Sequence, residues 1–530
     1  MDTHGAHRHG SRRQEAYDYS HVGCVLLKDE ARDEHVSNAH AELVMDTFAL
    51  RDEHAVLVLT TGGALFEVHS GATLRMLRVH LTNGSPGLRT ATCRSSEGGG
   101  AIRACVGANV ILEDLSITDC YSPVGGGGVL SYGHAVLRNV RLARLATGGR
   151  GGGINSGSGP GSSLLVNDSV IEACTAEFGG AAVLSSPWAR FSNTSFDSCL
   201  AHTFMTGYPE REPVQRGGAI FVEGEDVELV LDRGSRLSNC SASKDGGAIN
   251  IENQGGSYRH ILRLISVTLE GCHAGGEGGG VAASGAEIVM VNARLNGCWA
   301  RQAGGGVMLV AAAQRSQMDV RDSSILDCSC TDGDGGALFI ESGLVDVTDS
   351  EVIGCRAERF GGGFASSGTL TITRALLSDC KAGTAGGALD VAGDGTLHLG
   401  RVNIFHCAGL WHGASIRTST EIRVALVNIT HECSLQNNYG AIHLTGGSTS
   451  LRGLQVSLIG QCPRAVTTEG SAKALVECSV DTCGFDAECT PGAPLVLNSN
   501  ESAETSMTCA CLPLGYAVSR LPELSLHFES

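Results

Sequence analysis

The sequence predicts an all-β fold, a right-handed, single-stranded parallel β-helix of about 13–14 rungs. Three observations predict it. A motif built around one cysteine recurs along the chain, mostly every 25 to 30 residues. The residues before each cysteine alternate apolar and polar, as in Leu-Val-Asp-Val-Thr at 344–348. Glycine is almost twice as frequent as in ordinary proteins, with 73 among 530 residues.

Each copy of the motif has an apolar residue, a cysteine three positions later and a Gly-Gly pair further on. In one copy these are Leu237, Cys240 and Gly246-Gly247. In one copy Leu145 takes the place of the cysteine. One copy is too short to bury its own apolar side chains, so the copies must stack and share a core. The cysteine column contains Cys120, Cys174, Cys199, Cys240, Cys272, Cys298, Cys328, Cys355, Cys380, Cys407, Cys433 and Cys462.

The geometry of a rung follows from the motif. Alternating segments are typical of strands with one buried face, and equivalent side chains on stacked strands lie about 4.8 Å apart. A rung of about 27 residues suits three short strands and three turns. The Gly-Gly pairs mark one corner, because glycine allows positive φ and close approach of two backbones. A glycine column repeated in this way predicts a corner of the coil and not a phosphate-binding loop.

Three interpretations of the cysteine column remain open: a metal ladder, disulfides between neighbouring rungs, and buried free thiols. A single column offers an ion ligands from one direction only, which disfavours a metal. Disulfides are sterically feasible at the rung spacing, but parallel Cβ vectors disfavour the required torsion. We favour buried thiols that act as small apolar fillers, because Leu145 can replace a filler and cannot replace a ligand.

Composition and charge limit the classes of partner and the cellular location that are expected. The net charge of −18 argues against nucleic acid, whose binders need a basic face. No run of 18 apolar residues occurs, so no transmembrane segment is expected. The 21 cysteines and six Asn-x-Ser/Thr sequons favour an extracellular or cell-surface location, and we expect a signal peptide missing from this chain to precede Met1. The candidate N-glycosylation sites are Asn83, Asn167, Asn193, Asn239, Asn428 and Asn500.

The chain divides into three predicted regions. Residues 1–50 form a polar N-terminal segment or cap, residues 51–470 the β-helix, and residues 471–530 a cysteine-rich tail. The end of the coil needs a cap because it exposes strand edges. The two longest spacings between successive copies of the motif, from Cys199 to Cys240 and from Cys240 to Cys272, come from polar insertions at Phe204–Gln215 and Gln254–Tyr258.

The repeats resemble those of the polymorphic outer membrane proteins, which pair Phe-x-x-Asn with Gly-Gly-Ala-Ile. Gly246-Gly-Ala-Ile249 matches the second half, and Phe196-Asp-Ser-Cys199 matches the first with Cys in place of Asn. The resemblance implies a surface adhesin with a right-handed β-helix of the pectate-lyase-like superfold. The tail, with Cys478-x4-Cys483-x5-Cys489, is similar to a partial epidermal-growth-factor-like module.

An enzyme is the alternative, because β-helices also carry hydrolases and lyases of acidic polysaccharides. An active site of the polygalacturonase type would require an Asp-Asp pair, and the chain has none; His412-Gly413 is an isolated His-Gly. Asp322 and Asp349, six residues before a motif cysteine, are the nearest candidates for a Ca²⁺ site. The interpretation that we favour is a turn column of Asn and Asp side chains with no metal.

We therefore expect no catalytic residues and no cofactor. The sequence favours a non-enzymatic surface or secreted protein whose partners are glycans or surface proteins, or a structural spacer, with a polysaccharide-active enzyme as the alternative.

Overall fold

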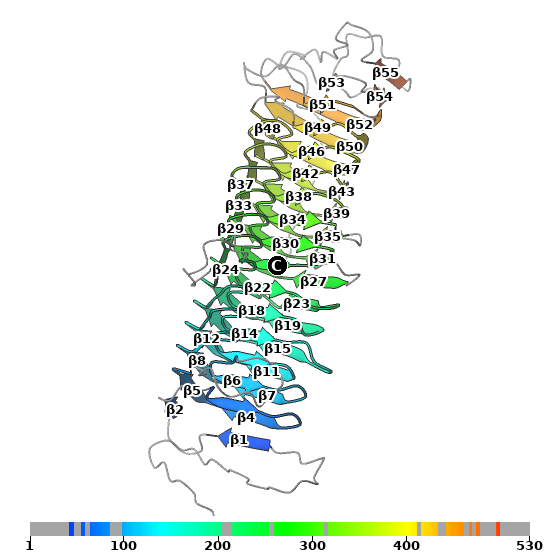
Figure 1. The fold of residues 1–530 in the computed structure, drawn as a ribbon. Helices are drawn as coiled ribbons and strands as arrows, with labels where there is room; N and C mark the ends of the chain where they lie inside the picture. Colours follow the sequence, from blue (N-terminus) through cyan, green and yellow to red (C-terminus); the bar gives the residue numbers. More distant parts are fainter. Residues whose placement is uncertain are drawn as a thin grey trace, which may run out of the picture.

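The protein is a parallel β-solenoid of about 11 turns, which confirms the predicted all-β fold (Figure 1). No helix occurs in the residues that the computed structural model describes. Those residues are 42–46, 55–58, 64–84, 98–202, 215–253, 259–311, 316–410, 415–432, 441–446, 448–459, 466–468, 473–477 and 494–498. The number of complete turns is below the 13–14 expected, because that expectation also counted motif copies, such as that of Cys462, outside the described residues.

Each complete turn has four strands and not the three expected. In one turn these are β27 (His260–Ile265), β28 (Thr268–Glu270), β29 (His273–Ala274) and β30 (Val281–Ser284). Two residues, the first of them with positive φ, separate each of the first three strands from the next, so the chain turns a corner without a long loop. Corners this short are what made the sequence appear to contain fewer strands.

The first two strands of every turn belong to one 29-stranded sheet and form two ladders in it. The first ladder contains β1 (Glu42–Asp46), β4 (Thr73–Leu77), β7 (Asn109–Glu113), β11 (His134–Arg138), β15 (Ser163–Asn167), β19 (Trp188–Ser192), β23 (Glu228–Asp232), β27, β31 (Ala286–Val291), β35 (Gln317–Arg321), β39 (Leu344–Thr348) and β43 (Thr369–Thr373). The second contains β2 (Ala55–Val58), β5 (Val79–Thr82), β8 (Ser116–Thr118), β12 (Arg141–Ala143), β16 (Val170–Glu172), β20 (Ser195–Asp197), β24 (Arg236–Ser238), β28, β32 (Arg294–Asn296), β36 (Ser324–Leu326), β40 (Glu351–Ile353) and β44 (Leu376–Ser378).

Near the C-terminal end of the coil the two ladders merge into longer strands. These are β47 (Thr396–Phe405), β50 (Glu421–Glu432) and β52 (Ser448–Ile459), followed by β54 (Lys473–Glu477). The last strand, β55 (Pro494–Asn498), pairs with β54 antiparallel, unlike every other pair of described strands.

The third strand of each turn lies in an 11-stranded sheet, sheet C. Its strands have two residues each: β9 (Tyr121–Ser122), β13 (Ala146–Thr147), β17 (Thr175–Ala176), β21 (Leu200–Ala201), β25 (Ser241–Ala242), β29, β33 (Trp299–Ala300), β37 (Ser329–Cys330), β41 (Arg356–Ala357), β45 (Lys381–Ala382) and β48 (Ala408–Gly409).

The fourth strand lies in a 15-stranded sheet, sheet B, which follows the Gly-Gly corner. Its strands are β3 (Phe66–Val68), β6 (Ile102–Ala104), β10 (Val129–Ser131), β14 (Ile154–Ser156), β18 (Ala182–Leu184), β22 (Ile220–Val222), β26 (Ile249–Ile251), β30, β34 (Val307–Val310), β38 (Leu338–Ile340), β42 (Phe364–Ser366), β46 (Leu389–Val391), β49 (Ile416–Thr418), β51 (Ile442–Leu444) and β53 (Val466–Thr468).

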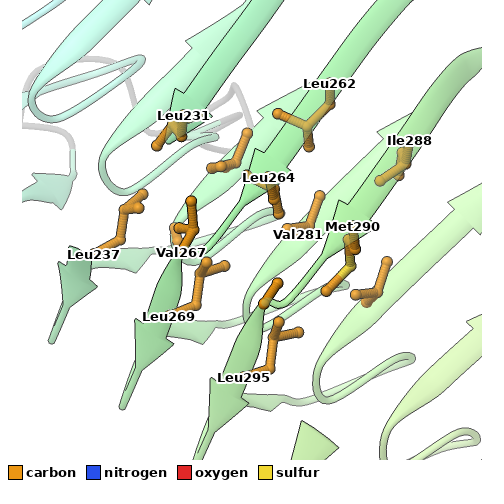
Figure 2. Close-up of a cluster of buried hydrophobic side chains, with 14 of the residues drawn as sticks. Leu231, Leu237, Leu262, Leu264, Val267, Leu269, Val281, Ile288, Met290 and Leu295 are labelled. Atoms are coloured by element: carbon orange, nitrogen blue, oxygen red, sulfur yellow. The ribbon is translucent and has the colours of Figure 1, made fainter. Parts of the chain in front are cut away.

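The core is a set of stacked columns inside the coil. Leu269 pairs with Leu295 in register, and Ile325 pairs with Val352, so the apolar residue three positions before each cysteine lies above its equivalent. These four side chains are at most 2% exposed. Figure 2 shows leucines from successive turns, among them Leu237, Leu269 and Leu295, lying side by side in the interior.

The two glycines of the corner have different roles. Gly246, the first of its pair, has a φ of +69°. A Cβ on Gly247, the second, would lie 2.1 Å from the carbonyl oxygen of Gly279 in the next turn. The first glycine is therefore required by backbone conformation and the second by the close approach of neighbouring turns.

Replacing the second glycine should destabilise the protein more than replacing a glycine that is held only by its φ. We expect Gly247→Ala to lower the free energy of unfolding by roughly 2–3 kcal/mol, because the Cβ forces two hydrogen-bonded turns apart. Gly297 has a φ of +61° and open space around its missing Cβ, so Gly297→Ala should cost only about 1 kcal/mol. Denaturant unfolding measures both, and equal losses would contradict the proposed role of Gly247.

Candidate functional site

The cysteine column lies in the interior. Its ten described members, from Cys120 to Cys407, are buried free thiols. Burial raises the pKa of the Cys120 thiol to about 11. The same cause raises the pKa of the Cys330 thiol, which is outside the column, to about 11. Thiols in this state are unreactive, so the column fills space and offers no chemistry at the surface. Cys433 and Cys462 lie outside the described side chains.

Thiol reactivity tests the column directly. We expect the column thiols to resist a disulfide reagent in the native protein and to react once guanidinium chloride unfolds the chain without reductant, because the folded chain buries them out of reach of the reagent. Cys298→Ala should reduce the unfolded count by one and leave the native count unchanged. If fewer than half of the column reacts after unfolding, the turns are joined by disulfides.

The Asn and Asp column six residues before the cysteines forms a corner. Asp322 and Asp349 have φ values of 49° and 50°, and they lie on successive turns. The Arg374 guanidinium donates two hydrogen bonds, of 2.6 and 2.7 Å, to the Asp349 carboxylate, and these lower the pKa of Asp349. Elsewhere in the column the Asn139 side-chain amide donates a hydrogen bond of 2.7 Å to the Asp114 carboxylate. The column thus makes side-chain ladders on the surface.

One group of described side chains is dense enough for a metal, and it includes neither aspartate. It consists of Glu67, His69 and Cys105, whose ligand atoms lie within 4.8 Å of one another. Cys105 is disulfide-bonded and therefore offers no thiolate.

The other predicted sites are distributed over the surface. Among the candidate glycosylation sites Asn167 is half-buried, and Asn83, Asn193, Asn239 and Asn428 are exposed. The Asn193 amide donates to Asp168 at 2.8 Å, so it belongs to the corner column. Asn500, His412-Gly413 and the tail cysteines lie outside the described residues.

The outer face of sheet B carries a candidate site that was not predicted from the sequence. The middle residue of each strand in this sheet points outward, and we call these residues the outer row. Several are buried despite pointing outward: Phe221 is 2% exposed, Ala282 4%, and Asn250 and Met308 5% each. Their burial means that neighbouring side chains cover this face.

Ion pairs between the two edges of sheet B cover part of the outer row. Arg150, before β14, pairs with Glu223, after β22, at 2.5 Å. Arg216, before β22, pairs with Glu252, after β26, and also approaches Asp245 at 3.3 Å. The two arginines therefore connect the side of sheet B where its strands begin with the side where they end.

Next to Arg216 the side chains that cover the outer face of sheet B leave a pocket of about 330 Å³. Its floor includes the outer-row residues Asn250, Ala282 and Met308. Four carboxylates line it together with Arg216: Asp245, Glu252, Glu277 and Glu341. The two insertions predicted from the spacing adjoin it in sequence, since one ends beside Arg216 and the other begins after Asn253.

The carboxyl groups of sheet B differ electrostatically from those of the 29-stranded sheet. Burial raises the pKa of Glu277, and the charges of Asp245 and Glu341 add to the shift. Burial also raises the pKa values of Glu223, Asp334 and Asp390, which lie on the same face. The acids whose pKa values are lowered, Glu113, Asp119, Asp197 and Asp349, all lie on the 29-stranded sheet or at its corners. Destabilised charges gathered on one face are typical of a functional site.

This difference predicts a pH-dependent gain in stability from Glu277→Gln. Because the folded-state pKa of Glu277 is raised, its stabilisation is complete below the ordinary pKa of about 4.5 and is lost as pH rises through the folded-state pKa. Glutamine avoids that loss, so the variant should melt at a higher temperature than wild type at pH 7 and at nearly the same temperature at pH 4.

Glu351→Gln is the control, since Glu351 is exposed on β40 of the other sheet and should show no such pH-dependent difference. Thermal unfolding at the two pH values checks this prediction. A Glu277 variant less stable than wild type at pH 7 would contradict it.

Comparison with known proteins gives no family. No model of a known protein family matches the chain, and no curated protein matches it. The described residues contain no helix long and apolar enough to cross a membrane.

Proposed function

We propose that the protein is a non-enzymatic, elongated surface or secreted protein that binds a glycan or protein chain on the outer face of sheet B. The observation that carries this proposal is a pocket of about 330 Å³ on that face that is lined by four carboxylates, one of which, Glu277, has a pKa raised by burial. Pockets of this size with a few converging polar groups are typical binding sites. The likeness of the repeats to surface adhesins supports the same assignment.

The charge of the site selects the partner. Four carboxylates and one guanidinium line the pocket, so its net charge is negative when all five are ionised. An acidic polysaccharide or a nucleic acid would be repelled, whereas a neutral or basic chain would not. The site therefore favours neutral or basic partners over the polyuronates that pectate-type lyases cut.

A glycan hydrolase is the second candidate. Glu277, with its raised pKa, has the property of a general acid, and three further carboxylates line the same pocket. Arg216 already engages Asp245 and Glu252, which leaves Glu341 to act as the second carboxylate. The sequence has no Asp-Asp pair, and we therefore favour the binding function over the hydrolase function.

Binding is tested with immobilised protein and four soluble polymers: polylysine, chitosan, a neutral β-glucan and polygalacturonate. We expect saturable binding of at least one of the first three and no release of reducing ends from any polysaccharide. Ala282→Trp should weaken that binding about tenfold or more, because the indole fills the pocket.

Ala146→Trp is the matched control, since Ala146 is an outward-facing alanine of β13 in sheet C. It should leave binding unchanged. Cleavage of a polysaccharide that Glu277→Gln abolishes would establish the hydrolase instead. Binding that is equally insensitive to both tryptophan variants would place the partner on another face.

A further inference from the structure

We propose that the pocket on sheet B is a recognition site for a primary alkylammonium group, either of a lysine side chain or of a free polyamine. This inference rests on the proposed function and names the chemistry that the binding face recognises. It depends on three groups that accept hydrogen bonds, Asn250, Glu277 and Glu341.

The first observation is an unsatisfied acceptor on the pocket floor. Asn250 is 5% exposed, and its Oδ1 atom is buried with no hydrogen-bond partner. The side chain points outward into the pocket, because its strand neighbours Ile249 and Ile251 belong to the core. A buried amide oxygen without a partner destabilises the folded chain, so a ligand that donates a hydrogen bond to it would recover that lost energy.

The second observation is the uneven distribution of positive charge in the pocket. Arg216 pairs with Asp245 and Glu252, and the Asp245 carboxylate also accepts a hydrogen bond of 3.1 Å from the Glu277 backbone N–H. Among the described residues, none forms an ion pair with the Glu277 or Glu341 carboxylate. Lys244 also lies 4.0 Å from Asp245, so Asp245 and Glu252 have two described cations beside them, whereas Glu277 and Glu341 pair with none.

A second acidic cluster on the same sheet shows how the protein neutralises such a group with its own cation. Asp390, in the outer row like Asn250, is 5% exposed and receives a hydrogen bond of 3.2 Å from Arg417 of the next turn. The Arg417 guanidinium also lies 4.1 Å from the centre of the Phe360 ring. In the pocket, the outer-row residues of the next two turns are Ala282 and Met308, which supply no charge.

The dimensions favour an organic cation over a metal ion. Among the described residues only Glu67, His69 and Cys105 bring three His, Cys, Asp or Glu ligand atoms within 4.8 Å of one another, so no three carboxylates of the pocket meet as a metal site would require. A volume of about 330 Å³ suits a short alkyl chain, whose methylenes would contact Ala282 and Met308 while the ammonium reaches the acceptors. Three N–H donors on a primary ammonium match the amide oxygen and the two carboxylates.

Calorimetric titration of the full chain tests this, with spermidine and with a capped peptide that contains one lysine. We expect at least one of them to bind, and Glu277→Gln and Glu341→Gln each to weaken it about tenfold or more, since each removes a charged hydrogen bond. If only the peptide binds, the site is assigned to a protein partner. If only spermidine binds, the site is assigned to a free polyamine.

Three controls make the result specific. Glu351→Gln removes the same charge from another sheet and should leave affinity unchanged. The acetyl-lysine peptide should not bind, and the trimethyl-lysine peptide, which has no N–H donor on its cation, should bind at least about tenfold more weakly. Ca²⁺ at millimolar concentration should not displace the amine; displacement would identify a metal site and overturn the proposal.

Failure here is distinguishable from failure of the proposed function. If a neutral polymer binds and Ala282→Trp prevents that binding, while neither amine binds the wild-type protein, the binding face stands and the alkylammonium site is wrong. Amine binding that is unchanged in both glutamine variants also overturns it.

Discussion

The structure depends on the parallel hydrogen-bonded ladder that joins each turn to the next. This ladder fixes the register, so a residue in one turn lies directly above its equivalent, as Ile325 lies beside Val352. Every column must then hold residues that can stack on one another. Apolar columns merge into one continuous core. The second glycine of each corner is the strictest case, because a Cβ there would overlap the backbone of the neighbouring turn.

Predictability from sequence follows from how strictly each column constrains its residue type. The interior columns tolerate only small or apolar side chains, so the cysteines, the apolar residues and the glycine corner were all visible in the sequence. The corner one residue before the cysteine was not. It requires only positive φ, and Asp119, Arg144, Ala173 and Gly271 all meet that requirement. A column defined by conformation alone leaves a weak sequence signal. For this reason the sequence predicted three strands per turn, whereas the structure has four.

The candidate site was missed for a related reason. The outer row of sheet B holds Phe221, Asn250, Ala282 and Met308 in four successive turns, and no residue type repeats. Its carboxylates come from two columns, since Asp245 and Glu277 precede the Gly-Gly pairs of neighbouring turns and Glu252 and Glu341 follow strands of sheet B, and neither column repeats one residue type along the coil. The signal that was available is the pair of insertions beside Arg216 and Asn253, which interrupt the spacing where the pocket forms.

The charges of the two large faces suggest how stability and recognition are divided in this molecule. On the 29-stranded sheet an arginine from one turn pairs with an acid from another, as Arg374 does with Asp349, and the pKa of the acid falls. Such exposed pairs contribute little to stability individually. On sheet B burial raises the pKa values of four acids, so their ionised forms are disfavoured in the folded chain. Asp390 is engaged by Arg417, whereas Glu277 pairs with no described cation. A face that keeps one destabilised, unpaired carboxylate beside an unsatisfied amide gains most from a ligand that brings the missing positive charge.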